Sequence, residues 1–374
     1  MAVIAYAAEV TMTADDSKIT YVGRVLLENQ TAQFDWTGTY AKVAFEGKQI
    51  KIRLSSDATK TIQAGFVGTI EDKRDYINVF VDGDISPTPT YTFRIPSDNK
   101  DTSIVITMKK RGKHSLILHK KTEAEHGTIT LKDFTTDGSF LQADSLKSRQ
   151  IEFVGDSYTC GFGATLNCVK TDRFTPETED QSLTYAAVIA RYFDADFVTI
   201  AHSGMGIARN YGSTHKNYCM PRRYTQTFDI DTSYLWEASK SAFKPAITVI
   251  YIGGNDFSQL MQPHYTVFRN AYFKLLDEIK ANYGDTYPIL CCVPPGKEKF
   301  LGEYVYDLVK EYNLLNPDKG NVVCVDLDKN VYNSESDLGA ASHPNYNGHK
   351  KVAYTMIPYI ATATGWDLQE KAIK

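Results

Sequence analysis

The chain has 374 residues, of which 43% are hydrophobic, and its formal net charge is −4. This length and apolar content predict two ordinary globular domains and exclude a largely disordered chain. The slightly acidic balance argues against nucleic acid as a partner, and no apolar stretch reaches the roughly 18–20 residues that cross a bilayer. The first eight residues are apolar, but they are too short and lack the basic leader of an intact signal peptide.

Residues 20–140 alternate apolar and polar side chains with a period of two, which is typical of β-strands with one buried face. The run 42–54 is expected to form two strands that join at a turn around Gly47. Further strands are expected at 78–84, which runs into an Asp-Gly turn, and at 103–108, 114–119 and 127–131. Several short strands without a strong helix predict a β-sandwich domain over residues 1–140.

From residue 148 onward, strand-like runs alternate with helical stretches. The expected strands are 151–154, 197–201, 246–252, 288–293 and 321–325, and the expected helices are 184–193, 267–283, 301–312 and 348–360. This alternation predicts an α/β domain over residues 148–374, in which a parallel sheet has helices on both faces. The boundary is expected within 135–148, and the long aromatic loop 210–234 is expected to cover part of a site.

A serine follows the first of these parallel strands, in the motif Gly155-Asp156-Ser157. Open α/β sheets place ligands at the carboxyl ends of their strands, so Ser157 is a candidate nucleophile. Gly155 permits a tight turn, and the N–H of Ser157 is suited to bind a developing oxyanion. The alternative interpretation is a helix-capping serine, which is common, so the tripeptide alone is a weak signal.

Three further candidates come later in the chain. Gly204 follows a strand and lets a backbone N–H approach a ligand closely, while Asn255 follows another strand and can donate its side-chain amide to an oxyanion. Their alternative interpretations are an ordinary strand-to-helix turn and a turn-forming asparagine. His343, which precedes a proline near the end, is the candidate general base. Together with the serine, this order of residues predicts a serine esterase.

The sequence gives little support for a metal site or a disulfide. His343 and His349 are six residues apart across a proline, which is poor ligand geometry, so we expect no metal, and no other cofactor is expected. His349 is expected to be a structural partner on the final helix, and His202 a packing or surface residue. Six cysteines are too few for a disulfide scaffold, although a Cys160–Cys168 pair stays open.

The order of these motifs resembles the SGNH (GDSL-type) hydrolase superfamily, whose four blocks supply the residues that are here Ser157, Gly204, Asn255 and His343. More closely, the whole chain resembles carbohydrate esterase family two in the stretches GDSYTCGFG, DQSLTYAAVIARYFDADF, SGMGIARNYG, FKPAITVIYIGGNDFS and HPNYNGH. The resemblance implies a three-layer, flavodoxin-like SGNH domain after an N-terminal jelly roll. It also implies secretion and the removal of O-acetyl groups from acetylated xylan or glucomannan, with the 6-O position of hexoses as one candidate.

The sequence departs from that resemblance at the third member of the catalytic triad. The superfamily usually has an aspartate three residues before the histidine, and this family often has one two residues before it, but these positions are Ala340 and Ala341. We therefore expect a Ser157–His343 dyad whose imidazole is oriented by a backbone carbonyl, with Asp337 as the alternative partner. Removing the aspartate of a triad costs about 10⁴ in rate, so a working but slower enzyme is expected.

Two other functions stay open at this point: a non-catalytic carbohydrate-binding protein derived from such an esterase, and an SGNH esterase that acts on lipids or thioesters. The expected partner is an acetylated plant polysaccharide or oligosaccharide, with neither nucleic acid nor a membrane involved. The expected location is secreted, periplasmic or at the cell surface. Phe257 is the first candidate for a ring beside the acyl pocket, followed by Tyr158 and Tyr211.

Overall fold

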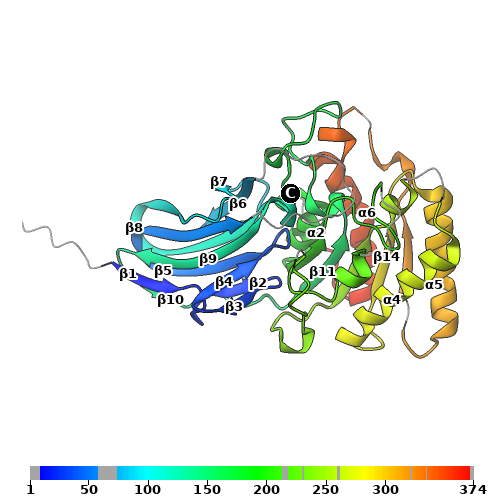
Figure 1. Cartoon of the computed structure of the whole chain (residues 1–374), viewed down its shortest axis with the longest axis horizontal. Helices are drawn as coiled ribbons and strands as arrows, with labels where there is room; N and C mark the ends of the chain where they lie inside the picture. The colour runs from blue at the N-terminus through cyan, green and yellow to red at the C-terminus, as the bar shows by residue number, and fades with distance from the viewer. Residues whose placement is uncertain are drawn as a thin grey trace, which may run out of the picture.

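The computed structural model describes residues 9–57, 74–212, 218–229, 231–258, 262–320, 322–333 and 335–370. An antiparallel β half is followed along the chain by an α/β half, and the two lie side by side in Figure 1. The expected fold class is confirmed, because an all-β antiparallel domain precedes a parallel sheet with helices. Among the helices in the described ranges, none combines the length and the apolar composition needed to cross a membrane.

The strands of the β half are hydrogen-bonded into one ten-stranded sheet in the order β3-β4-β9-β5-β8-β6-β7, with β1 on β9 and with β2 and β10 on β5. Their bounds are β1 Val10–Thr13, β2 Thr20–Val22, β3 Leu26–Glu28, β4 Thr31–Phe34, β5 Tyr40–Asp57, β6 Arg74–Val81, β7 Tyr91–Pro96, β8 Thr102–Lys120, β9 Thr128–Thr136 and β10 Ser139–Leu141. The jelly-roll arrangement implied by the resemblance stays a prediction.

The two longest strands, β5 and β8, differ from the prediction. The turn expected at Gly47 is wrong, because β5 continues through a β-bulge between Gly47 and Gln49 and pairs with β8 on both sides of it. Glycine is needed there because an added Cβ would lie 2.6 Å from Thr136 Oγ1 on β9. The strands expected at 103–108 and 114–119 are likewise two parts of the single strand β8.

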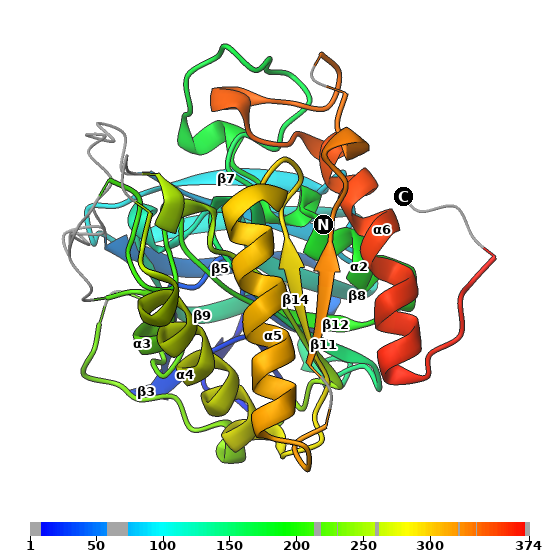
Figure 2. The same cartoon turned by 90° about the vertical axis from the view of Figure 1, so that its right-hand side faces the viewer.

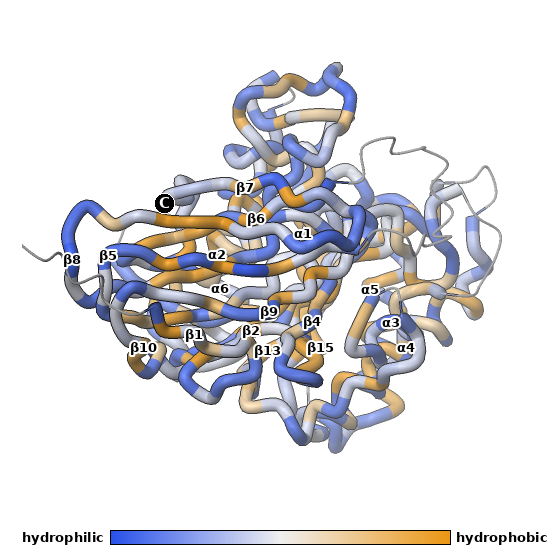
Figure 3. The backbone as a smooth tube through the Cα atoms, turned by 60° about the vertical axis from the view of Figure 1, so that its left-hand side comes forward, coloured by the Kyte–Doolittle hydropathy of each residue, from blue (hydrophilic) through white to orange (hydrophobic). Residues whose placement is uncertain are grey.

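Alternation along the strands builds the core of the β half. On β5, Ile50, Ile52 and Leu54 are fully buried, while Arg53 between them is exposed. Apolar segments follow the strands of both halves, and connecting loops are largely hydrophilic (Figure 3). The period-two pattern therefore identified the buried face correctly even where the strand ends were misplaced.

The α/β half contains a five-stranded parallel sheet in the order β12-β11-β13-β14-β15. The strands are β11 Gln150–Gly155, β12 Asp196–Ala201, β13 Ile247–Tyr251, β14 Ile289–Val293 and β15 Val322–Asp326. The helices are α1 Ser157–Cys160, α2 Tyr185–Phe193, α3 Met220–Arg223, α4 Tyr265–Tyr283, α5 Glu303–Leu315 and α6 Tyr346–Thr364. All five expected strands and all four expected helices are present, with ends shifted by a few residues.

The parallel sheet lies between two layers of helices. Helices α2 and α6 pack together on one face, while α4 and α5 pack together on the other (Figure 2). The chain leaves strand β11 first toward β12 and later returns to its other side as β13, so the strand order reverses at β11. Ligands of open α/β sheets bind at the carboxyl end of such a strand. The fold therefore places the expected site just beyond Gly155.

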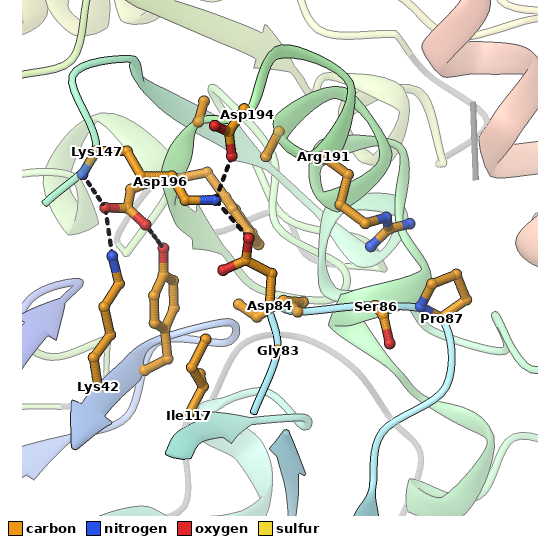
Figure 4. Close-up of a pocket in the computed structure, with 15 residues that line it drawn as sticks. Lys42, Gly83, Asp84, Ser86, Pro87, Ile117, Lys147, Arg191, Asp194 and Asp196 are labelled. Atoms are coloured by element: carbon orange, nitrogen blue, oxygen red, sulfur yellow. Dashed lines mark hydrogen bonds and ion pairs between the residues drawn. The ribbon is translucent and has the colours of Figure 1, made fainter. Parts of the chain in front are cut away.

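Buried polar contacts join the two halves beside a cavity of about 430 Å³ (Figure 4). Asp196, at the start of β12, accepts hydrogen bonds from the Tyr40 hydroxyl (2.7 Å) and from Lys42 Nζ (2.9 Å), both on β5. The same carboxylate accepts the backbone N–H of Lys147 at 2.7 Å. The last antiparallel strand ends at Leu141 and the first parallel strand begins at Gln150, so we propose that the two domains join between these residues.

The pair between Lys42 and Asp196 predicts a large stability effect. Its two side chains are 9% and 3% exposed, so Asp196→Ala would leave a buried ammonium without its carboxylate. We expect the free energy of unfolding to fall by about 3–5 kcal/mol. The control is Asp194→Ala, which removes a 72% exposed partner of Lys147 and should cost less than about 1 kcal/mol. Urea denaturation measures both variants, and equal losses would contradict the prediction.

Candidate active site

Ser157 lies two residues beyond the end of β11, at the first position of the short helix α1. The helix cap is Asp156, whose Oδ1 accepts the Tyr158 N–H at 3.2 Å, so the cap does not require the Ser157 hydroxyl. Ser157 is 8% exposed and lines a cavity of about 220 Å³. Ser157 therefore lies at the wall of a small pocket.

Gly155 is required for close approach at the end of β11. A Cβ at this position would lie 1.8 Å from Thr159 Oγ1 in the helix turn that carries the serine. The Thr159 hydroxyl is itself hydrogen-bonded to the Tyr185 hydroxyl at 2.8 Å. The glycine thus lets α1 fold back directly onto the strand and fixes the height of Ser157 above the sheet.

The structure brings Ser157 and His343 together although they are 186 residues apart in sequence. The Ser157 Oγ lies 2.9 Å from His343 Nε2. His343 Nδ1 lies 3.1 Å from the carbonyl oxygen of Ala341, which can only accept, so Nδ1 carries the proton and Nε2 is free to accept from the serine. This is the tautomer that a general base needs.

The carbonyl that orients His343 comes from a strained backbone segment. Ala341 and Ser342 have φ values of +52° and +58°, in the left-handed region that costs a non-glycine residue about 1–2 kcal/mol. Two hydrogen bonds hold them there: the Ala341 N–H donates to Asp172 O (2.8 Å) and the Ser342 N–H donates to Lys170 O (3.0 Å). The loop that follows the serine therefore keeps this carbonyl in place.

The carboxylate of Asp337, the alternative partner of His343, has other contacts. It accepts hydrogen bonds from Lys351 Nζ at 2.5 Å, from the Asn333 N–H at 2.6 Å and from the Ser336 hydroxyl at 3.0 Å. These bonds tie the loop before the histidine to helix α6. The geometry favours the Ala341 carbonyl over Asp337 as the group that orients the imidazole.

Asn255 lines the same cavity as Ser157, and its amide is already hydrogen-bonded. Nδ2 donates to the Met205 carbonyl at 2.8 Å and to Asp156 Oδ2 at 3.1 Å. Burial raises the pKa of Asp156 to about 7. Because both hydrogen bonds of Asn255 Nδ2 are already made, an oxyanion beside Ser157 would compete with Asp156 for one N–H of this amide. The sequence did not predict this competition.

Gly204 is close to this arrangement without being one of the described residues that line the cavity. It is buried with φ +75°, its carbonyl accepts the N–H of the cavity residue Tyr211 at 2.8 Å, and the neighbouring Met205 carbonyl contacts Asn255. Asp256 holds the same loop, because its carboxylate accepts three consecutive backbone N–H groups, those of residues 207–209, at 2.7–3.0 Å. Sequence reasoning missed this role, and its only signal was the position directly after Asn255.

The three aromatic candidates, Phe257, Tyr158 and Tyr211, all line the cavity. The Tyr158 ring meets the His343 ring edge-on, with centroids 5.3 Å apart. Tyr211 is 48% exposed at the beginning of the loop expected to cover the site. Residues 213–217 and 230 of that loop lie outside the described residues. Lys297, which the sequence analysis did not single out, adds a positive charge to the lining.

Behind Gly204 lies a buried charged cluster. His202, expected to be a packing or surface residue, is buried and lies 2.6 Å from Asp229 Oδ2 and 3.6 Å from Glu123 Oε2. Burial alone would lower the pKa of His202, but the carboxylates of Asp229 and Glu123 raise it to about 9. The imidazole is therefore charged at neutral pH.

One group in the described part of the chain has the composition of a metal site. The donor atoms of Glu123, His126 and Glu179 all lie within 4.8 Å of one another. Hydrogen bonds already occupy them: Glu179 Oε2 contacts His126 Nε2 at 3.2 Å, and Glu179 Oε1 accepts the Glu123 N–H at 2.7 Å. Within the part of the chain that the structure describes, no hydrogen bond or ion pair joins this group directly to Ser157 or His343.

The remaining candidates, His349 and the cysteines, lie in surroundings typical of residues with a structural role. His349 is buried, its ring stacks on that of Tyr185 at a centroid distance of 6.3 Å, and burial lowers its pKa to about 3. All six cysteines are free, so Cys160 and Cys168 do not form the bridge that had been left open. What the cavity offers chemically is a serine nucleophile, a neutral imidazole base and amide donors, which are the components of acyl transfer.

Two family models match the chain. The model of the carbohydrate esterase 2 N-terminal domain matches residues 21–143, and that of GDSL-like lipases and acylhydrolases matches residues 151–356. The chain is 30% identical over 370 residues to the cellulase/esterase CelE of Acetivibrio thermocellus, covering 96% of this chain and 41% of that protein. It is 28% identical over 274 residues to an acetylxylan esterase / glucomannan deacetylase of Cellvibrio japonicus, covering 71% and 67%. The chain thus spans less than half the length of CelE.

Solved structures show the same architecture. A family two carbohydrate esterase from Clostridium thermocellum in complex with cellohexaose is 27% identical, with a TM-score of 0.78 over 93% of this chain and 100% of that one. A family two carbohydrate esterase from Cellvibrio japonicus is 20% identical, with a TM-score of 0.78 over 96% and 99%. Both likenesses extend across the β half and the α/β half.

The contacts of Asp337 predict that it is dispensable for turnover. Because its carboxylate is bonded to Lys351 and not to His343, Asp337→Ala should keep hydrolysis of p-nitrophenyl acetate within about threefold of the wild type, whereas loss of a triad aspartate costs about 10⁴. Its melting temperature should fall, because the buried tie to α6 is lost. A hundredfold or greater loss of rate, with an unchanged near-UV circular dichroism spectrum, would contradict the dyad.

The surroundings of His343 also predict the pH dependence. Burial lowers its pKa to about 4, and the imidazole accepts a proton only when neutral, so kcat/KM should hold down to about pH 5 and fall with a midpoint near 4. An inflection near pH 7 that vanishes in Asp156→Asn would belong to Asp156. A His343 midpoint near its ordinary value of about 6.5 would refute the expectation.

Proposed function

The chain belongs to the GDSL-like lipase/acylhydrolase family and carries the N-terminal domain of carbohydrate esterase 2, and from this premise we propose that it removes O-acetyl groups from plant polysaccharides. The observation that carries the proposal is the hydrogen bond of 2.9 Å between the Ser157 hydroxyl and His343 Nε2 inside the cavity. The curated relatives named as acetylxylan esterase / glucomannan deacetylase support xylan and glucomannan as substrate polymers.

In the proposed reaction, Ser157 Oγ attacks the acetyl carbonyl carbon while its proton passes to His343 Nε2. The carbonyl oxygen becomes an oxyanion, for which we propose the N–H groups of Ser157 and Gly204 and the Asn255 amide as donors. Collapse of the intermediate breaks the bond to the sugar oxygen, which takes the proton from the imidazolium. Water then attacks the acetyl-serine by the same steps, releasing acetate and restoring Ser157.

The oriented imidazole supports a dyad with limited charge stabilisation. The Ala341 carbonyl fixes the tautomer of His343, but a neutral carbonyl offsets the imidazolium charge less than an aspartate would. The amide donor matters correspondingly more, because removing one such donor costs about 2.7–4 kcal/mol of barrier. We therefore propose that catalysis by this enzyme depends more on the oxyanion donors than it does in enzymes with a complete triad.

The cavity supports a small acyl group on a carbohydrate. Its volume of about 220 Å³, bounded by Phe257 and Tyr158, suits an acetyl group better than a long acyl chain, which argues against a lipid substrate. The partly exposed ring of Tyr211 can stack on a sugar face beside it. A polymer of this kind is degraded outside the cell, so secretion remains part of the proposal.

The test is acetate release from acetylated xylan, acetylated glucomannan and monoacetylated glucose, mannose and xylose. Wild type should release acetate, and Ser157→Ala should lose at least about 10³-fold in rate with its near-UV circular dichroism spectrum unchanged. The monoacetylated sugars separate 6-O from ring positions. Binding of glycan by the wild type without hydrolysis of any ester would instead support the non-catalytic carbohydrate-binding alternative, and full turnover by Ser157→Ala would refute the site.

A further inference from the structure

We propose that Glu123, supplied by the N-terminal β domain, is a positioning residue of the oxyanion hole, so that the two domains form one catalytic unit. The inference rests on the proposed esterase function and adds a residue that lies outside the hydrolase half. Glu123 follows β8 in the chain and is 1% exposed. Its side chain extends into the α/β half behind the cavity.

The Glu123 carboxylate touches both backbone segments that supply oxyanion N–H groups. Its Oε2 accepts the backbone N–H of Ser203 at 2.6 Å, and Ser203 directly precedes Gly204. The same oxygen accepts the S–H of Cys160 at 3.5 Å, and Cys160 ends the four-residue helix that begins with Ser157. A single atom therefore bridges the turn of the nucleophile and the turn of the glycine.

Hydrogen bonds to the backbone of Glu123 hold the residue that carries the bridging carboxylate. The Glu123 N–H donates to Glu179 Oε1 at 2.7 Å, and the Glu123 carbonyl accepts Lys120 Nζ at 3.2 Å. Lys120 is in turn paired with Asp75 at 2.8 Å, with both side chains fully buried. Buried and hydrogen-bonded at both ends, Glu123 has little freedom to move, which is the property that a positioning group requires.

The neighbourhood acts on the charge of this carboxylate in both directions. Burial and the nearby Glu179 carboxylate raise the pKa of Glu123, whereas the His202 imidazolium, 3.6 Å away and held by Asp229, and the hydrogen bond from the Ser203 N–H favour the ionised form. The charged hydrogen bond to the Ser203 N–H is stronger than a neutral one. Its removal would leave that N–H buried without its acceptor and release the Gly204 turn on one side.

The expected effect is on turnover and not on substrate binding. Oxyanion donors act on the transition state, and a displacement of about 1 Å in such a site can cost about 100-fold. Glu123→Ala should therefore lower kcat for p-nitrophenyl acetate by about 10- to 100-fold, with KM within about twofold. Glu123→Gln keeps an oxygen that can accept the Ser203 N–H and should recover most of the rate. Glu123→Asp keeps the charge, falls short of Ser203 and should resemble the alanine variant.

The matched control is Glu125→Ala in the same turn. Glu125 lies 3.7 Å from His202 and is partly exposed, with no described contact to Ser203 or Cys160. Its loss should change kcat by less than about twofold. If the alanine variant fails to fold, the glutamine and aspartate variants can replace it, because they keep polar groups of similar size. Comparing their kcat values shows whether the length of side chain 123 or its charge is what turnover requires. Equal kcat in wild type, Glu123→Asp and Glu123→Ala would overturn the proposal.

A readout independent of deacetylation separates this inference from the proposed function. Paraoxon phosphorylates an activated serine, and the phosphoryl oxygen needs the same donors, so the rate of Ser157 inactivation should fall in Glu123→Ala in parallel with kcat. If the wild type hydrolyses no acetyl ester yet reacts with paraoxon, the proposed substrate is wrong while Glu123 is still tested. Unchanged inactivation rates in folded Glu123→Ala would refute the positioning role.

Discussion

The proposed chemistry of this fold depends on the hydrogen bond between the Ser157 hydroxyl and His343. This bond joins the turn after strand β11 to the turn before the last helix, across 186 residues of chain. The contact exists only because the strand order reverses at β11 and because α6 packs beside α2 on the same face of the sheet. The buried core of the α/β half thus serves to bring two short turns within hydrogen-bonding distance.

The sequence predicted what depends on local pattern. Period-two and helical periodicities located the parallel strands and their helices, and the position of Ser157 after a strand placed it at the ligand-binding edge of the sheet. The course of β8 as one strand was missed because continuity across Gly112 depends on pairing with β5. Asp256 and Glu123 were missed for a similar reason, since each acts on backbone N–H groups 47 to 80 residues away along the chain. No local pattern encodes such contacts.

The interface between the two halves combines buried polar contacts with apolar packing, in which Trp36 and Phe80 of the β half join the core of the α/β half. The Lys42–Asp196 pair and the contacts of Glu123 join the two halves and are buried or nearly so, while the buried Lys120–Asp75 pair supports Glu123 from within the β half. Buried pairs of this kind add little net stability, because desolvation offsets their attraction, but they tolerate few alternative geometries. The two domains are consequently held in one relative orientation, which the reach of Glu123 into the neighbouring domain requires.

The left-handed backbone at Ala341 has a consequence for how the molecule tolerates mutation. The acceptor that orients His343 is a main-chain oxygen, and every amino acid carries one, so no single codon change can delete it. What can be lost is the path of the loop, which depends on the anchors at 170 and 172. A conventional triad can be disabled by one substitution of its acid, whereas here the same failure requires the loop to refold.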